Sequence, residues 1–145
     1  MEHPFDKPVK RIRAIHLRKA GACKAQIRTF LELFPKGAAP RMETAEKHCL
    51  SFNWDWAVGS LIRDFDLRYE ARKEIDAADK IAEEARQCRL DRFALGDGHI
   101  DAEAYSEQGR KDHEAWKLAC ARAFAKAFIA QQGRLSADPE YLVQG

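Results

Sequence analysis

The sequence lacks the segments that would place it in or across a membrane. No apolar run approaches the roughly 18 residues that a transmembrane helix needs. The first residues, MEHPFDKPVKR, carry prolines and charges instead of the apolar stretch of a signal peptide. We therefore expect a soluble, unexported protein of the cytoplasm that makes no contact with a membrane.

Paired cysteines and a recognisable catalytic set are also missing. The four cysteines are widely spaced and form no CxxC motif, which favours free thiols in a reducing compartment. Adjacent polar pairs such as His48 and Cys49 diverge by about 100 degrees on a helix and cannot easily share a metal ion. No nucleophile, base and orienting group can be proposed together. We predict no enzymatic activity, no metal and no cofactor.

Alternating β-branched strands are absent as well, and apolar residues recur at helical spacing instead. The pattern predicts an all-α fold, with a compact N-terminal cluster of short helices followed by a long antiparallel helical hairpin. A chain of 145 residues suits one domain. We expect it to cover residues 1–133, with the short helices in 7–62, the hairpin in 63–133, and a tail over 134–145.

Helices are expected over residues 9–20 and 22–34, separated by Gly21, and then over 43–52 and 54–62. The second of these is expected to bury a stripe of Ile27, Phe30, Leu31 and Phe34. Asn53 or Asp55 can cap the last of these. In the second half, an amphipathic helix over 65–95 would end at the glycines of Gly96–Gly98. Asp101 is the expected N-cap of a final helix that ends before Gly133. Alanines on the inner faces would allow close packing, either within one chain or across a homodimer.

What the sequence does contain is a strongly one-sided distribution of charge. Residues 7–31 hold eight of the 25 basic residues and none of the 23 acidic ones, although the formal net charge is only +2. Such a segment offers a binding surface for an anion or an acidic partner. If the first helix covers residues 9–20, Arg11 and Arg18 share a face. The candidate binding residues here are Arg11, Arg13, Arg18, Lys19, Lys24 and Arg28.

Two tryptophans, Trp54 and Trp56, form a second candidate feature. Residues two apart on a helix point to different sides, so one of them is expected in the core and the other at the surface. The exposed member would be an aromatic anchor for a partner, because tryptophan is enriched at the energetic centres of interfaces.

The segments Ala20-Gly21-Ala22-Cys23 and Asn53-Trp54-Asp55-Trp56-Ala57, followed by the alanine-rich charged half, resemble a group of small helical proteins encoded by phages and prophages. Those proteins share an N-terminal "gAC" helix and a (D/N)WDWA segment, and most are uncharacterised. Small phage accessory proteins of this kind commonly bind and block a host machine. The resemblance implies a non-enzymatic, phage-derived interaction protein that inhibits a bacterial defence complex such as a CRISPR-Cas effector by direct protein binding.

The basic segment leaves a second interpretation open. A small nucleic-acid-binding regulator would use the same residues, 7–31, to contact phosphates. A helix-turn-helix reading places Gly21 in the turn, but Leu17 stands where that turn needs a small residue and His16 where it needs an apolar one. We therefore rank binding to a host protein complex above binding to nucleic acid.

Overall fold

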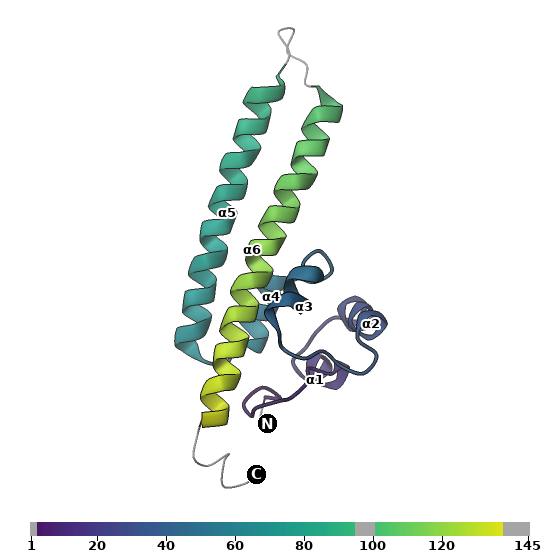
Figure 1. The fold of residues 1–145 in the computed structure, drawn as a ribbon, viewed down its shortest axis with the longest axis vertical. Coiled ribbons are helices and arrows are strands. Elements are labelled where there is room, and N and C mark those ends of the chain that lie inside the picture. Colours follow the sequence, from purple (N-terminus) through teal and green to yellow (C-terminus); the bar gives the residue numbers. More distant parts are fainter. Residues whose placement is uncertain (1–2, 95–100, 138–145) are drawn as a thin grey trace.

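The computed structural model describes residues 3–94 and 101–137, and within them the protein is helical with no extended strand. The all-α prediction is therefore confirmed. The helices are α1 (Ala14–Lys19), α2 (Lys24–Leu33), α3 (Met42–Lys47), α4 (Trp54–Leu61), α5 (Phe65–Phe93) and α6 (Ala102–Ala137). The two longest, α5 and α6, lie side by side, and the four short helices gather beside one end of this pair (Figure 1).

Contacts between α5 and α6 show that the two helices run antiparallel. Residues early in α5 meet residues late in α6: Lys126 Nζ lies 2.9 Å from Glu74 Oε1, whereas Arg89 Nη1 lies 2.6 Å from Asp112 Oδ2. The expected turn at Gly96–Gly98 lies outside the described residues. Asp101 caps α6 as predicted, because its Oδ1 accepts a hydrogen bond from the Ala104 amide at 3.2 Å.

The last helix is longer than the sequence suggested. Gly133 was expected to follow its end, but α6 continues through this glycine to Ala137, so that prediction is wrong. A glycine ends a helix only where the backbone turns to positive φ, and Gly133 does not do so. Arg134, one residue further on, is instead bound at 2.7 Å to Asp64, the N-cap of α5. The expected tail beyond Ala137 lies outside the described residues.

The core lies where α4, α5 and α6 meet the N-terminal segment. Its largest fully buried side chains are Phe5, Phe128, Ile62 and Val58. The ring of Phe5 packs edge-on against that of Phe128, with ring centroids 5.1 Å apart. Close by, Gln132 Oε1 of α6 accepts a hydrogen bond from the Val9 amide at 2.7 Å. The segment before α1 is thus fastened to α6 by both apolar and polar contacts.

The first helix is much shorter than the predicted 9–20, because α1 begins only at Ala14. Ile12 instead pairs with Ala38 in an isolated antiparallel bridge, in which both amide-to-carbonyl distances are 2.8 Å. These hydrogen bonds hold the backbone extended where the apolar spacing had predicted a helix. At the other end, Gly21 with φ of +93° closes α1 in a Schellman motif, since the Ala22 amide donates to Leu17 O at 2.9 Å.

The middle of the chain follows the prediction more closely. Asn53 caps α4, with its side-chain oxygen accepting a hydrogen bond from the Trp56 amide at 3.1 Å. Asp55, the alternative cap, instead forms an ion pair with Arg72 of α5. The preceding helix α3 ends at Lys47 rather than at residue 52.

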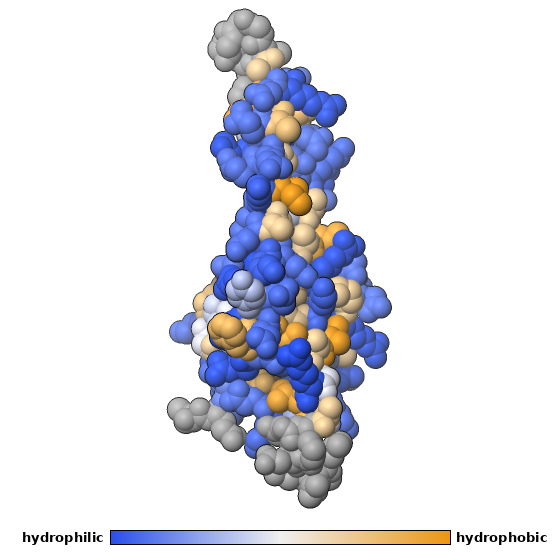
Figure 2. Space-filling model, turned by 90° about the vertical axis from the view of Figure 1, so that its left-hand side faces the viewer, coloured by the Kyte–Doolittle hydropathy of each residue, from blue (hydrophilic) through white to orange (hydrophobic). Residues whose placement is uncertain are grey.

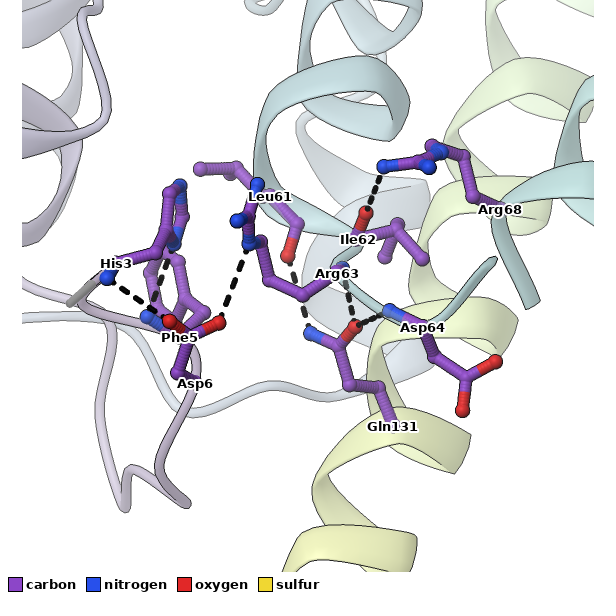
Figure 3. A network of polar contacts seen from close by, with 9 residues as sticks. All are labelled: His3, Phe5, Asp6, Leu61, Ile62, Arg63, Asp64, Arg68 and Gln131. Atoms are coloured by element: carbon purple, nitrogen blue, oxygen red, sulfur yellow. Dashed lines mark hydrogen bonds and ion pairs between the residues drawn. The ribbon is translucent and has the colours of Figure 1, made fainter. Parts of the chain in front are cut away.

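A buried glutamine holds the sharp break between α4 and α5. Gln131 is only 2% exposed, and its side-chain oxygen accepts hydrogen bonds from the backbone amides of Arg63 and Asp64. Its amide nitrogen donates to Leu61 O at 3.0 Å. One side chain of α6 therefore satisfies three backbone groups at the junction (Figure 3). Left without partners in the core, these groups would be costly.

Far from this core, α5 and α6 continue as two helices packed mainly on each other. Buried residues of α5 stop at Ala78, and Ile81 is exposed. The principal polar contact of this distal part is the Arg89–Asp112 pair, whose side chains are 14% and 21% exposed. Figure 2 views the α5 side, where hydrophobic residues appear as separate patches on a largely hydrophilic surface.

Candidate binding surface

The predicted binding cations lie on the N-terminal segment and on α1 and α2, and all of them are exposed. None of them forms an ion pair with any described residue. The same holds for Lys10, Lys36 and Arg41 nearby. These unpaired cations, which we call the cationic surface, are Lys10, Arg11, Arg13, Arg18, Lys19, Lys24, Arg28, Lys36 and Arg41.

Most arginines elsewhere in the described chain do form ion pairs. Arg63, Arg72, Arg122 and Arg134 all reach carboxylates on other segments of the chain. Arg110 contacts two acids of its own helix, Glu107 and Glu114, at 2.7 Å each. The cationic surface is therefore distinguished by missing counter-charges rather than by its number of basic residues. An unneutralised field of this kind attracts anions over distances comparable with the Debye length, about 8 to 10 Å in physiological salt.

The structure places five of the six predicted cations in two groups, and the sixth, Lys19, is the last residue of α1. Arg11 and Arg13 flank Ile12 in the bridge to Ala38, and their side chains pass beside Gly37. A β-carbon on Gly37 would lie 2.9 Å from Ile12 O and 3.3 Å from the Arg13 side chain, so glycine is required for this close approach. The prediction that Arg11 and Arg18 share a helical face is wrong, because Arg11 precedes α1.

The second group surrounds a shallow depression between α1 and α2. Arg18, Lys24 and Arg28 line it together with Ile27, Leu31 and Glu32. Leu31 was expected in the buried stripe of α2, but it is 45% exposed. An exposed leucine among three cations combines an apolar contact with positive charge, and Glu32 is the one acid of the depression. Sequence periodicity placed Leu31 in the core because it follows Phe30 and Ile27 on the helix, and only the packing of α2 reveals its exposure.

The pKa of His16, a histidine beside the cationic surface, is affected by the positive charges of that surface. His16 Nδ1 accepts a hydrogen bond from the Arg13 amide at 2.9 Å, and the ring packs against Phe5 with centroids 5.4 Å apart. Burial lowers the pKa of His16 below its usual value, and the positive charges of Arg13 and Lys19 lower it further. The neutral imidazole therefore accommodates the cations around it.

The two predicted tryptophans divide as expected. Trp54 is buried, packs on Phe124 with ring centroids 5.5 Å apart, and donates a hydrogen bond from its indole to Cys49 O at 2.7 Å. Trp56 is half-buried. Trp54 thus acts as a core anchor, and Trp56 is the tryptophan that a partner could reach. Both also line an apolar cavity that no sequence pattern predicted.

Other chemical features are sparse in the described ranges 3–94 and 101–137. No group of three or more His, Cys, Asp or Glu side chains there is arranged to hold a metal ion. Burial raises the pKa of the Cys120 thiol to about 11, which keeps it protonated at neutral pH. No helix in these ranges has the length and apolar character needed to cross a membrane.

Comparison of the chain with protein-family models, with curated proteins and with solved structures finds no match. The resemblance to phage-encoded helical proteins therefore stays a prediction, carried by the segments around Gly21 and Trp54 and by the alanine-rich charged half.

Proposed function

We propose that this chain is a non-enzymatic interaction protein whose cationic surface binds an acidic face of a partner protein. The observation that carries the proposal is the contrast in pairing: the cations of residues 10–41 have no counter-charge, whereas those of the helix pair mostly do. Clustering like charges without partners opposes folding. Binding of a partner would account for these residues, whereas the contacts within the described chain do not.

The exposed Leu31 and the half-buried Trp56 support a protein partner. A protein interface combines charges at its rim with apolar anchors nearer its centre. The depression formed by Arg18, Lys24 and Arg28 around Leu31 has this composition on a small scale. Taken with the resemblance to phage-encoded proteins, it leads to our specific proposal, which is inhibition of a bacterial defence complex such as a CRISPR-Cas effector.

A small nucleic-acid-binding regulator is the second candidate, since the same unpaired cations could contact phosphates. The two candidates differ in their response to salt. Binding through six phosphates gives a slope of log K against log salt of about −5, and the bound material is destroyed by nuclease. A protein interface with an apolar centre responds less steeply, because only part of its free energy is electrostatic.

The test is a pull-down with the tagged chain from bacterial lysate that carries defence systems. The lysate is divided into nuclease-treated and untreated halves, and the bound material is identified by mass spectrometry and by nucleic-acid absorbance. We expect a stoichiometric protein that survives nuclease. Recovery of nucleic acid alone, lost after treatment, would overturn the proposal in favour of the regulator.

Two matched variants connect the result to the surface. The first reverses three cations of the depression, as R18E/K24E/R28E. The control, K80E/R92E/K111E, makes the same change of net charge at exposed cations of α5 and α6 that form no ion pair with any described residue. We expect the first variant to lose the partner and the control to retain it. Equal capture by both would remove the cationic surface from the proposal.

A further inference from the structure

A half-enclosed cavity of about 100 Å³ lies between α2, α3, α4 and α6, separate from the shallow depression of the cationic surface. Its floor consists of buried apolar side chains from all four helices, with aromatic rings dominating. The floor residues are Phe30, Ala45, Trp54, Ala57, Leu61, Phe124 and Phe128. Small apolar cavities of this kind stay dry, and an enclosed one of about 150 Å³ accepts benzene. This cavity is smaller but open on one side, so a bound ring would not need to be fully enclosed.

The mouth has a different chemistry from the floor. The lining residues that reach solvent include Gln26, Arg41, Thr44 and His48. Arg41 is exposed and unpaired among the described residues, and the hydroxyl of Thr44 and the ring nitrogens of His48 form no hydrogen bond there. Gln26 uses its side-chain oxygen to accept from the Asn53 amide at 3.1 Å, which leaves its NH₂ group as a donor.

Among the described residues, no aspartate or glutamate lines the cavity. The mouth therefore offers one full positive charge and several hydrogen-bond donors without a competing anion, above an aromatic floor. A ligand that matches both parts carries a compact apolar group and a single negative charge. Ligand sites generally have this composition, with an apolar lining and a few polar groups that fix orientation.

We propose that the cavity binds a small monocarboxylate with a compact apolar group of about six carbons, with the apolar group inside and the carboxylate at Arg41. The cavity shares Arg41 with the cationic surface and Trp56 with the proposed partner contacts, but the depression of Arg18, Lys24 and Arg28 is not part of its lining. Guanidinium groups are suited to carboxylates, since they present two parallel donors.

Benzoate is the probe for this site, measured by isothermal titration calorimetry and by amide shifts in NMR spectra. Benzyl alcohol keeps the ring without the charge, and acetate keeps the charge without the ring. We expect saturable one-to-one binding of benzoate, about fivefold weaker binding of benzyl alcohol, and none of acetate. Equal affinity for benzoate and benzyl alcohol would overturn the role of Arg41, and no saturable binding of benzoate would overturn the site.

Variants test the position of the ligand. Ala45→Leu fills the floor and should abolish benzoate binding, with folding checked by circular dichroism. Ala39→Leu, at a half-buried lining position, serves the same purpose if the first variant does not fold. Arg41→Gln should reduce benzoate affinity about fivefold and leave benzyl alcohol unchanged. The matched control Arg28→Gln, on the depression, should change neither. Benzoate binding that survives filling of the cavity would contradict the proposal.

Discussion

Basic side chains are used in two different ways in the two regions of this protein. In the helix pair, arginines bind carboxylates that are distant in sequence, as Arg134 does with Asp64 and Arg122 with Glu46. In residues 10–41 they bind none of the described acids. The comparison separates cations that serve the fold from cations that are available to a partner. Total charge could not reveal this, because the residues outside 10–41 hold 16 basic against 22 acidic side chains and bring the net value down to +2.

Phe128 of α6 is nearly fully buried and packs against Phe5 of the N-terminal segment, so its removal should have the largest effect. Phe128→Ala deletes a side chain that is 1% exposed and loses its edge-on contact with Phe5. We expect a loss of about 3 to 5 kcal/mol in the free energy of unfolding. The control Phe65→Ala removes a phenylalanine that is 69% exposed and should change the value by less than about 0.5 kcal/mol. Urea unfolding gives both numbers, and similar losses would contradict the assigned core.

The polar junction at Gln131 should give the next largest effect. Gln131→Leu preserves approximate size but leaves two backbone amides and the Leu61 carbonyl without their partner. We expect a loss of about 2 to 3 kcal/mol, measured by thermal or urea unfolding. Gln87→Leu is the matched control, because Gln87 is exposed and bonds only Asp91. If the two substitutions were equally mild, water would have to replace Gln131 at the break between α4 and α5.

A paired arginine in the distal part of the helix pair allows a more local test. The Arg89 guanidinium lies over the Tyr105 ring and lowers the pKa of Asp112 by hydrogen bonding. Arg89→Met should cost about 1 to 3 kcal/mol, because it leaves a half-buried carboxylate unpaired.

Hydrogen exchange should show this loss mainly in residues 83–93 and 102–112, with 71–78 and 120–128 little changed. Arg86→Met removes an exposed pair with Glu83 and should leave the stability and the exchange pattern nearly unchanged. Uniform loss of protection along both helices would show that the distal part does not open independently.

Acidification should produce the smallest effect. The pKa values of His16 and His3 are lowered in the folded protein, chiefly by burial, so the unfolded chain takes up protons near pH 6.5 that the folded chain resists. Stability should therefore fall as the pH decreases from 7 to 5. His16→Gln should reduce this slope, and His16→Gln with His3→Gln should reduce it further. Stability that rises on acidification, in urea titrations at pH 7 and 5.5, would contradict the assignment.

The sequence predicted the features that depend on local signals. Asp101 was identified as a helix cap and Asn53 as one of two candidates, because such side chains satisfy the amides of the next turn. The helical periodicity of α5 follows from its own residues. The prediction of a helix over residues 9–20 was wrong at its start, because the backbone of Ile12 forms its hydrogen bonds with Ala38. Helical periodicity within residues 9–20 carries no information about this distant partner.

The candidate binding surface likewise has features that the sequence predicted and features that depend on how the chain packs. The charge of the basic segment was evident from composition, but the lack of counter-charges was not, since it depends on which acids fold toward it. Gln131 gave no signal at all, because a glutamine in a helix is usually exposed. Leu31 and the aromatic cavity required the packing of α2 against its neighbours.

The central claim is that the cations of residues 10–41 contribute nothing to the fold. Urea unfolding of R18E/K24E/R28E tests it most directly. Because these side chains are exposed and unpaired, we expect the free energy of unfolding to remain within about 0.5 kcal/mol of the wild-type value per substitution, or to rise as like-charge repulsion is relieved. A loss of several kcal/mol would show that these residues stabilise the structure and would contradict the separation between the two regions.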